Sequence, residues 1–305
     1  MINYNEFHQV FPAELQSPYD RQLQNDIDSH RKELDGILFV DRVLKALGIT
    51  KAKTYPPKTD AALKQFHQHV CEANIATHHK LSLFYYILLD FDLVNGTSSA
   101  CNRFAMASGM PSNYQLFMTG LWHMDRADFS AAIEYVAHPC LGADFADDIL
   151  MTLVRHAPAG EQNLALAYFY SVQPILKSTA ALELLFASMV QTSATEALLF
   201  SRTFPEPTRE LLFQQLLKHA FGQGRGDEAS QAGEFLFFPF DTIEDAWLEQ
   251  YLSSGDGRSL KKAKDMLLVR RIACDKFAEV GKYRANSQWA AVLDGIRGGL
   301  DGTVE

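Results

Sequence analysis

Cysteine is scarce in this sequence, and none of its cysteines stands in a pattern typical of metal ligands or redox pairs. The chain has 305 residues and four cysteines, Cys71, Cys101, Cys140 and Cys274, which lie far apart with no CxxC spacing. A disulfide-stabilised miniprotein and a zinc ribbon are therefore excluded. We expect four buried thiols in a reducing compartment.

Long apolar runs are also lacking. The longest run, Leu81 to Val94, is interrupted by Asp90 and Asp92 and is too short to cross a bilayer. The first residues, MINYNEFHQVFPAELQ, do not show the basic stretch followed by an apolar stretch that marks a signal peptide. We therefore expect a protein of the cytoplasm or nucleus.

Motifs for common catalytic and cofactor chemistry are missing as well. The sequence contains no HExxH, no GxSxG, no GxxxxGK(S/T) and no GxGxxG after a strand pattern. His67 and Cys71 are four residues apart and His78 and His79 follow them, but zinc needs a closed set of about four ligands. The glycines of GQGRG, at 222–226, predict a flexible loop. We expect no metal and no cofactor.

One enzymatic pattern remains as an alternative. Residues 25–33, NDIDSHRKE, fit the motif (N/D)D(I/L/V)x(S/T)xxxE of class I terpene synthases, in which an Asn, a Ser and a Glu hold Mg²⁺ against a diphosphate. That family carries a DDxxD motif upstream, whereas the carboxylate cluster here is DFADD and lies downstream, at 144–148. A solvated helix face and a helix N-terminus explain both segments, so a class I prenyl-diphosphate enzyme is the second hypothesis.

The sequence is rich in apolar residues that recur at every third and fourth position, the period of packed helices. Leu34 to Leu47 form one run, closed by Gly48, and Leu63 to Ala73 form another, begun by Thr59 or Asp60. The segment 81–91, LSLFYYILLDF, is apolar on nearly every side. It predicts a central helix with neighbours all round.

Capping signals and prolines divide the rest of the chain into further short helices. Ser193 with Glu196, and Asp241 with Glu244, have the spacing of capping boxes. No fixed repeat period is present. We therefore predict an all-α fold, an irregular α-solenoid or helical bundle of about a dozen short antiparallel helices.

Charge is unevenly distributed along the chain. The formal net charge is −9, yet the segment 258–284 carries nine basic residues against three acidic ones, a local charge of +6. We expect a domain at 1–252 and, at 253–305, a hinge (Ser253 to Gly257) followed by basic C-terminal helices that pack on that domain or extend it. The candidate partner-binding residues are Arg258, Lys261, Lys262, Arg270, Arg271 and Trp289. The alternative is a basic segment that pairs with its own acidic body.

Several short phrases, in order along the chain, resemble one known family. They are Gly36 to Phe39, Tyr55 to Pro57, Tyr85 to Asp90, Met110 with Pro111, Gly120 to Asp125, His138 with Pro139, Leu166 to Tyr168, Glu196 with Ala197 and Arg202, Pro239 to Asp241 and Glu244 to Leu248. Their order and spacing resemble the ELYS-like helical domain of the nuclear pore complex assembly family, in its short fungal form.

The resemblance implies a non-enzymatic structural nucleoporin at the nuclear envelope. ELYS-like proteins attach to the Y-shaped scaffold complex of the nuclear pore, so other nucleoporins are the expected partners. Direct DNA or chromatin binding is not expected, because the chain shows neither a basic AT-hook tail nor a net positive charge. An α-solenoid adaptor of a membrane coat is a further alternative, since coats and pore scaffolds share that architecture.

Overall fold

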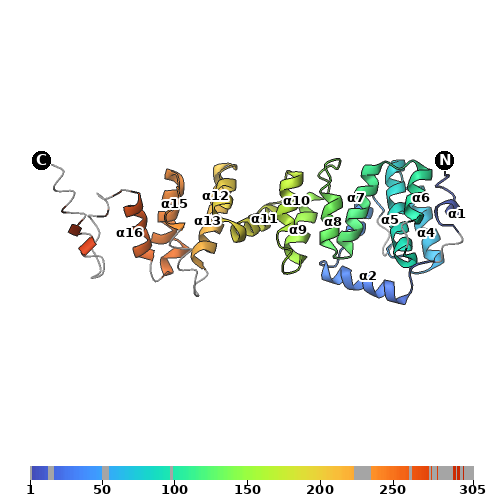
Figure 1. Cartoon of the computed structure of the whole chain (residues 1–305), viewed down its shortest axis with the longest axis horizontal. Helices are drawn as coiled ribbons and strands as arrows, with labels where there is room; N and C mark the ends of the chain where they lie inside the picture. Colours follow the sequence, from blue (N-terminus) through green and yellow to red (C-terminus); the bar gives the residue numbers. More distant parts are fainter. Residues whose placement is uncertain are drawn as a thin grey trace. The chain divides into compact units, whose positions relative to one another are not determined.

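The chain folds into short α-helices joined by turns (Figure 1). The computed structural model describes residues 2–12, 17–49, 55–96, 99–222, 235–260, 263–274, 276, 280, 291–292, 294–295 and 298. These ranges contain no strand, which confirms the predicted all-α class. The chain divides into two compact units, Met1–Ser188 and Met189–Glu305, and each is described by itself.

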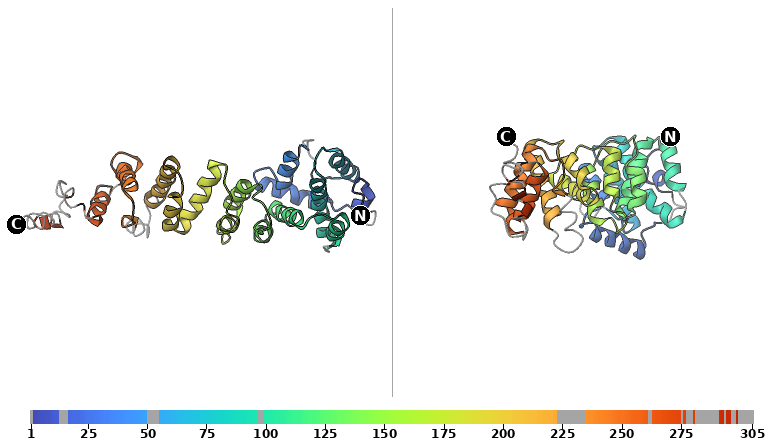
Figure 2. Two further views of the ribbon diagram at one scale, coloured as in Figure 1. Left: turned by 90° about the horizontal axis from the view of Figure 1, so that it is seen from above. Right: turned by 60° about the vertical axis from the view of Figure 1, so that its left-hand side comes forward.

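The first unit consists of helices that pack on their neighbours in sequence, among them α4 on α5, α5 on α6 and α7 on α8 (Figure 2). The boundary between the units falls within α11 (Thr179–Thr192). The other helices of the unit are α1 (Phe7–Val10), α2 (Arg21–Glu33), α3 (Phe39–Ala46), α4 (Asp60–Glu72), α5 (Thr77–Asn95), α6 (Ser99–Ser108), α7 (Ser112–Asp125), α8 (Phe129–Val136), α9 (Ala146–His156) and α10 (Leu164–Val172).

Helix α5 is the centre of the first unit, as its pattern predicts. Leu83, Phe84 and Ile87 are fully buried, and α4, α6 and α7 pack around the helix. Burying one such side chain contributes about 1.5–3 kcal/mol. The helix ends at Gly96, which adopts a left-handed conformation with φ 65° that glycine reaches without strain.

The run predicted from Leu34 to Leu47 is not one helix. Asp35 and Gly36 have φ values of 58° and 84°, so α2 ends before them and α3 begins only at Phe39. The start of α3 is set by Asp125, whose carboxylate accepts hydrogen bonds from the backbone N–H groups of Phe39 and Val40. A cap that comes from 86 residues away leaves no local signal in the sequence.

Two carboxylates lie inside the first unit. Asp90 accepts hydrogen bonds from Trp122 Nε1 at 2.8 Å, Tyr19 OH at 2.7 Å and Tyr55 OH at 2.9 Å. Asp125 accepts one from Tyr86 OH at 2.7 Å besides its two backbone donors. Burial raises the pKa of Asp125 to about 7, although the hydrogen bonds from Tyr86 and the backbone favour the charged form. Burial raises the pKa of Asp90 as well.

We expect Asp125 to make the first unit less stable as the pH rises from about 4 to about 7. The folded chain keeps a proton on Asp125 up to its pKa of about 7, whereas an unfolded Asp loses it near about 3.9. The folded state therefore binds more protons in this window, so raising the pH favours unfolding. Urea denaturation at the two ends of the window checks this: the wild type must lose more stability than Asp125→Asn, and equal losses would contradict the assignment.

The second unit is smaller and contains α12 (Ala194–Ser201), α13 (Glu206–Gly222), α15 (Thr242–Ser253), the 3₁₀ helix η1 (Asp256–Ser259) and α16 (Ala263–Ala273). The predicted cap at Ser193 is confirmed, since its hydroxyl accepts from the Glu196 N–H at 3.3 Å. Asp241 and Glu244 form the predicted capping box at the start of α15.

The segment after residue 252 is joined closely to the helix before it. Both η1 and α16 pack against α15. The described residues after 252 therefore belong to the second unit. The prediction of a domain at 1–252 did not anticipate the division within α11, because no change of composition marks that point.

Candidate docking surfaces

The predicted partner-binding residues differ in their surroundings. Arg258 is exposed on η1, and Arg270 and Arg271 lie in the last turn of α16. Lys261, Lys262 and Trp289 lie outside the described residues. Of the three that the structure describes, Arg258 is exposed, whereas Arg270 is buried and Arg271 is half-buried.

Arg270 is an internal residue of the second unit. It is 7% exposed, and its guanidinium binds Asp245 Oδ1 and donates to the carbonyls of Leu236 at 2.7 Å and Phe238 at 2.6 Å. It also lies over the Phe240 ring, 4.6 Å from the centroid. The sequence led us to expect Arg270 at a partner surface. Its charge is instead used within the unit.

Two further basic residues pair with the same acidic helix. Arg271 binds Glu249, and Lys276 Nζ lies 3.5 Å from Asp245 Oδ2. Both carboxylates belong to α15. For these residues the alternative holds, in which the basic segment pairs with its own acidic body.

We expect Arg270→Ala to lower the free energy of unfolding by about 2–3 kcal/mol, because it leaves two carbonyls without their charged donor and leaves Asp245 with the more distant Lys276 alone. Arg258→Ala is the matched control, with an expected effect below about 0.5 kcal/mol for an exposed side chain. Urea denaturation of the two variants measures the difference. Similar losses of stability in the two variants would show that the contacts of Arg270 do not stabilise the second unit.

Arginines also hold the aromatic loop 235–240, FLFFPF. Arg270 binds the two carbonyls named above, and Arg202 Nη2 donates to the Pro239 carbonyl at 2.7 Å. Phe237, in the middle of the loop, is 65% exposed. The loop therefore presents an aromatic side chain from a backbone that three hydrogen bonds hold in place.

A buried ion cluster joins α12, α13 and α15. Glu244 is fully buried, and its carboxylate receives Arg202 Nε at 2.9 Å and Nη2 at 2.7 Å. Arg209 also binds Glu244, together with Asp241. Burial raises the pKa of Glu244, but the hydrogen bonds from Arg202 and Arg209 outweigh it, so the pKa lies below its ordinary value.

A groove runs beside this cluster, between α13 and α15. Its cavity volume is about 190 Å³. One wall carries polar side chains of α13, the other carries two aromatic side chains of α15, and the turn into η1 lies at one end. The lining residues are Glu210, Gln214, Lys218, Trp247, Gln250, Tyr251, Gly255 and Asp256.

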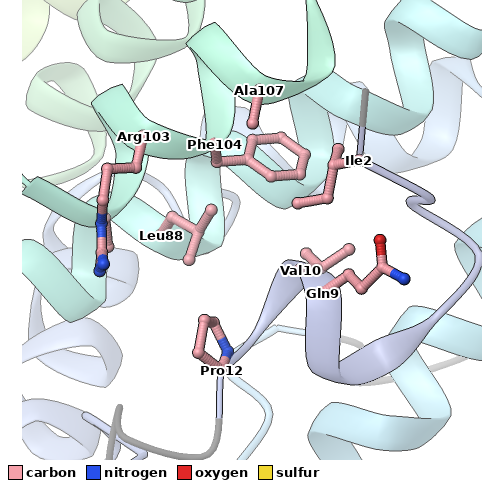
Figure 3. Close-up of a pocket in the computed structure, with 9 residues that line it drawn as sticks. Ile2, Gln9, Val10, Pro12, Leu88, Arg103, Phe104 and Ala107 are labelled. Carbon is pink, nitrogen blue, oxygen red and sulfur yellow. The ribbon is translucent and has the colours of Figure 1, made fainter.

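The first unit has an apolar cavity of about 140 Å³ under its N-terminal segment. Figure 3 shows Ile2 and Val10 of that segment beside Phe104 and Leu88. A hydrogen bond from the Ile2 N–H to the Ala107 carbonyl, at 3.0 Å, holds this segment against α6. The lining carries one charged residue, Arg103, so the cavity offers little polar chemistry to a ligand.

A wider cavity, of about 510 Å³, lies beside α2. Its charged lining residues neutralise one another. Arg31 pairs with Asp28 and Asp41, and Lys58 pairs with Asp28. The charges in this cavity therefore already have partners within the chain.

Some residues of the terpene synthase pattern and of the carboxylate cluster at 144–148 have partners within the chain. Ser29 Oγ donates to Glu33 Oε1 at 3.3 Å. Asp147 accepts from the backbone N–H of Ser178 at 2.7 Å, and Asp148 pairs with Arg42. In the part of the chain that the structure describes, no group of three or more His, Cys, Asp or Glu is placed to hold a metal ion.

His67 likewise has a structural partner. Its Nε2 lies 2.9 Å from the Tyr4 carbonyl, and its ring stacks on Phe84 at 5.0 Å. Burial lowers the pKa of His67, against the hydrogen bond to Tyr4. Cys71 lies on the same helical face as predicted, with Sγ 3.6 Å from His67 Nε2, and the pair lies beneath the N-terminal segment. The predicted glycine loop at 222–226 falls almost wholly outside the described residues.

The groove between α13 and α15 was not predicted from the sequence. A signal for it exists: Glu210, Gln214 and Lys218 recur every fourth residue, and Trp247 and Tyr251 have the same spacing. Each set shares one helical face. The sequence does not indicate that the two faces belong to adjacent helices.

Comparison with known proteins gives two matches. Residues 37–255 match the ELYS family, described as nuclear pore complex assembly. A stretch of 139 residues is 30% identical to the uncharacterized protein ely5 of Schizosaccharomyces pombe, and it covers 45% of this chain and 44% of that protein. Among the described residues, no helix is long and apolar enough to cross a membrane.

Proposed function

This chain belongs to the ELYS family of nuclear pore complex assembly proteins, and we propose that it is a structural nucleoporin that docks on the Y-shaped scaffold complex of the pore. The family match carries the proposal, because it extends from 37 to 255 and so takes in helices of both units. Of the residues that suggested prenyl-diphosphate chemistry, Asp147 accepts a hydrogen bond from a backbone N–H group and Asp148 pairs with Arg42.

Docking by such a protein works through shape and charge. Interfaces between proteins gain most of their affinity from a few buried aromatic and arginine side chains, while surrounding charges fix the orientation. The second unit offers two exposed side chains, Phe237 on the aromatic loop 235–240 and Arg258 on η1. We propose that the partner contacts the basic stretch at Arg258, Lys261 and Lys262.

The localisation of a fluorescent fusion protein tests the role. We expect a punctate nuclear rim that coincides with a scaffold nucleoporin. Cytoplasmic puncta would overturn the proposal in favour of a membrane-coat adaptor.

A pull-down with reconstituted subunits of the Y-shaped complex tests the contact. The triple variant Arg258→Glu, Lys261→Glu and Lys262→Glu is expected to weaken binding at least about tenfold, which corresponds to about 1.4 kcal/mol. The matched control, Lys58→Glu with Lys64→Glu and Lys80→Glu, places the same charges on the first unit. Circular dichroism confirms that both variants stay folded, and unchanged binding of the first variant would exclude the basic stretch.

A further inference from the structure

We propose that the groove between α13 and α15 binds an arginine side chain of a partner protein. The inference rests on the proposed docking function and names a contact of that function. It follows from three features of the groove: its charge, its balance of donors and acceptors, and its aromatic wall.

The groove is acidic. Two of its lining residues, Glu210 and Asp256, carry a negative charge, and Lys218 carries the positive one. Lys218 Nζ lies 3.1 Å from Asp256 Oδ2, so the charges of these two residues cancel. The charge of Glu210 then gives the lining a net charge of about −1. Burial raises the pKa of Tyr251, the Asp256 carboxylate raises it further, and Lys218 acts against both. A cationic group therefore suits the groove better than an anionic one.

Acceptors remain at the Glu210 end of the polar wall. Gln214 Nε2 donates to Glu210 Oε1 at 3.2 Å, which leaves the second carboxylate oxygen and the Gln214 carbonyl as acceptors. Gln250, exposed on the opposite wall, adds another amide. A ligand with several N–H donors and no acceptor matches this wall, and arginine is the side chain with five such donors.

Both rings of the aromatic wall are held in place by packing. Tyr251 stacks on Phe221, with ring centroids 6.3 Å apart and planes at 26°. Trp247 packs on Phe213 at 5.8 Å, and the Arg209 guanidinium lies 5.6 Å from the Trp247 ring. The chain thus already stacks one guanidinium on Trp247. A planar guanidinium gains more from such a surface than the ammonium group of lysine does.

The turn into η1 closes one end of the groove because two glycines permit it. A Cβ atom on Gly257 would lie 2.5 Å from Tyr251 Cε1, and one on Gly255 would lie 3.0 Å from the Tyr251 Cα. A side chain at 257 would therefore displace the tyrosine ring, and one at 255 would crowd the Tyr251 backbone. The predicted hinge is therefore a packed turn whose residues Gly255 and Asp256 line the groove.

Nuclear magnetic resonance on the full chain tests the inference directly. The probe is N-acetyl-arginine amide, and the signal is the indole N–H of Trp247, assigned with Trp247→Phe. We expect a saturable shift of this signal in the millimolar range, with no shift of the Trp122 indole. N-acetyl-lysine amide is expected to bind several times more weakly, because it lacks a planar group.

Glu210→Gln and Glu206→Gln form a matched pair of variants. Both remove one charge from α13, but only Glu210 lines the groove. We expect Glu210→Gln to raise the Kd of the arginine probe about twofold to fivefold, the range for an exposed ion pair, and Glu206→Gln to leave it unchanged. The inference is overturned by a Trp247 signal that does not shift, by equal binding of the lysine probe, or by equal Kd values for the two variants.

The test of the arginine site and the test of the pore role can fail independently. If the probe binds while the fusion protein misses the nuclear rim, the pore role fails and the arginine site stands. If the fusion protein reaches the rim while the probe leaves Trp247 unchanged, the groove assignment alone fails.

Discussion

Replacing Glu244 with alanine is expected to lower the free energy of unfolding of the second unit by about 4–5 kcal/mol, the upper part of the range for breaking a buried ion pair. Glu244 is fully buried and binds both Arg202 and Arg209. Its removal leaves Arg202 without a carboxylate and leaves Arg209 with Asp241 alone. It also removes one half of the capping box that begins α15.

Urea denaturation followed by the fluorescence of Trp247 measures this loss. Glu249→Ala is the control, since Glu249 lies on the same helix and its pair with Arg271 is 51% exposed on the glutamate side. We expect less than about 1 kcal/mol from the control. Glu244→Gln keeps the shape of the side chain and removes its charge, so it is expected to lose most of the same stability. A change below 1 kcal/mol in both Glu244 variants would refute the role of the cluster.

The second large effect is expected for Asp90→Ala in the first unit, a loss of about 3 kcal/mol or more. Each buried donor left without an acceptor costs about 1–3 kcal/mol, and Asp90 serves three: Trp122 Nε1, Tyr19 OH and Tyr55 OH. The raised pKa of Asp90 does not offset this, because a protonated carboxyl still accepts hydrogen bonds.

Asp26→Ala is the matched control for Asp90→Ala. Asp26 is exposed on α2, and its replacement is expected to change stability by less than about 0.5 kcal/mol. Thermal unfolding followed by circular dichroism compares the two, and equal melting temperatures would exclude a structural role for Asp90. The same control variant tests the prenyl-diphosphate alternative, which requires Asp26 for release of diphosphate with Mg²⁺.

Local features of the fold could be read from the sequence. The caps at Thr59, Ser193 and Asp241 each act within three residues of their own position, so the spacing alone reveals them. The burial of α5 follows from a run that is apolar on all sides. The family resemblance also extended over most of the chain, and the match at 37–255 confirms it.

Long-range features could not be read in the same way. Asp125 begins α3 from 86 residues away, and its own neighbours in sequence give no sign of that role. Arg270 looked like part of a basic surface because nearby residues are basic. Its carboxylate partner is 25 residues upstream, and only the packing of α16 on α15 brings the two together.

The sequence by itself determined that this protein is all α-helical, where many of its helices begin, and which family it belongs to. All of these depend on residues a few positions apart or on short phrases in order. The tertiary structure decided which charges are left for a partner. An arginine pairs with whichever carboxylate or carbonyl lies within about 3 Å, and helix packing alone sets that distance. Helix packing therefore places Arg270 inside the second unit and leaves the groove beside Glu210 as a candidate contact for a partner.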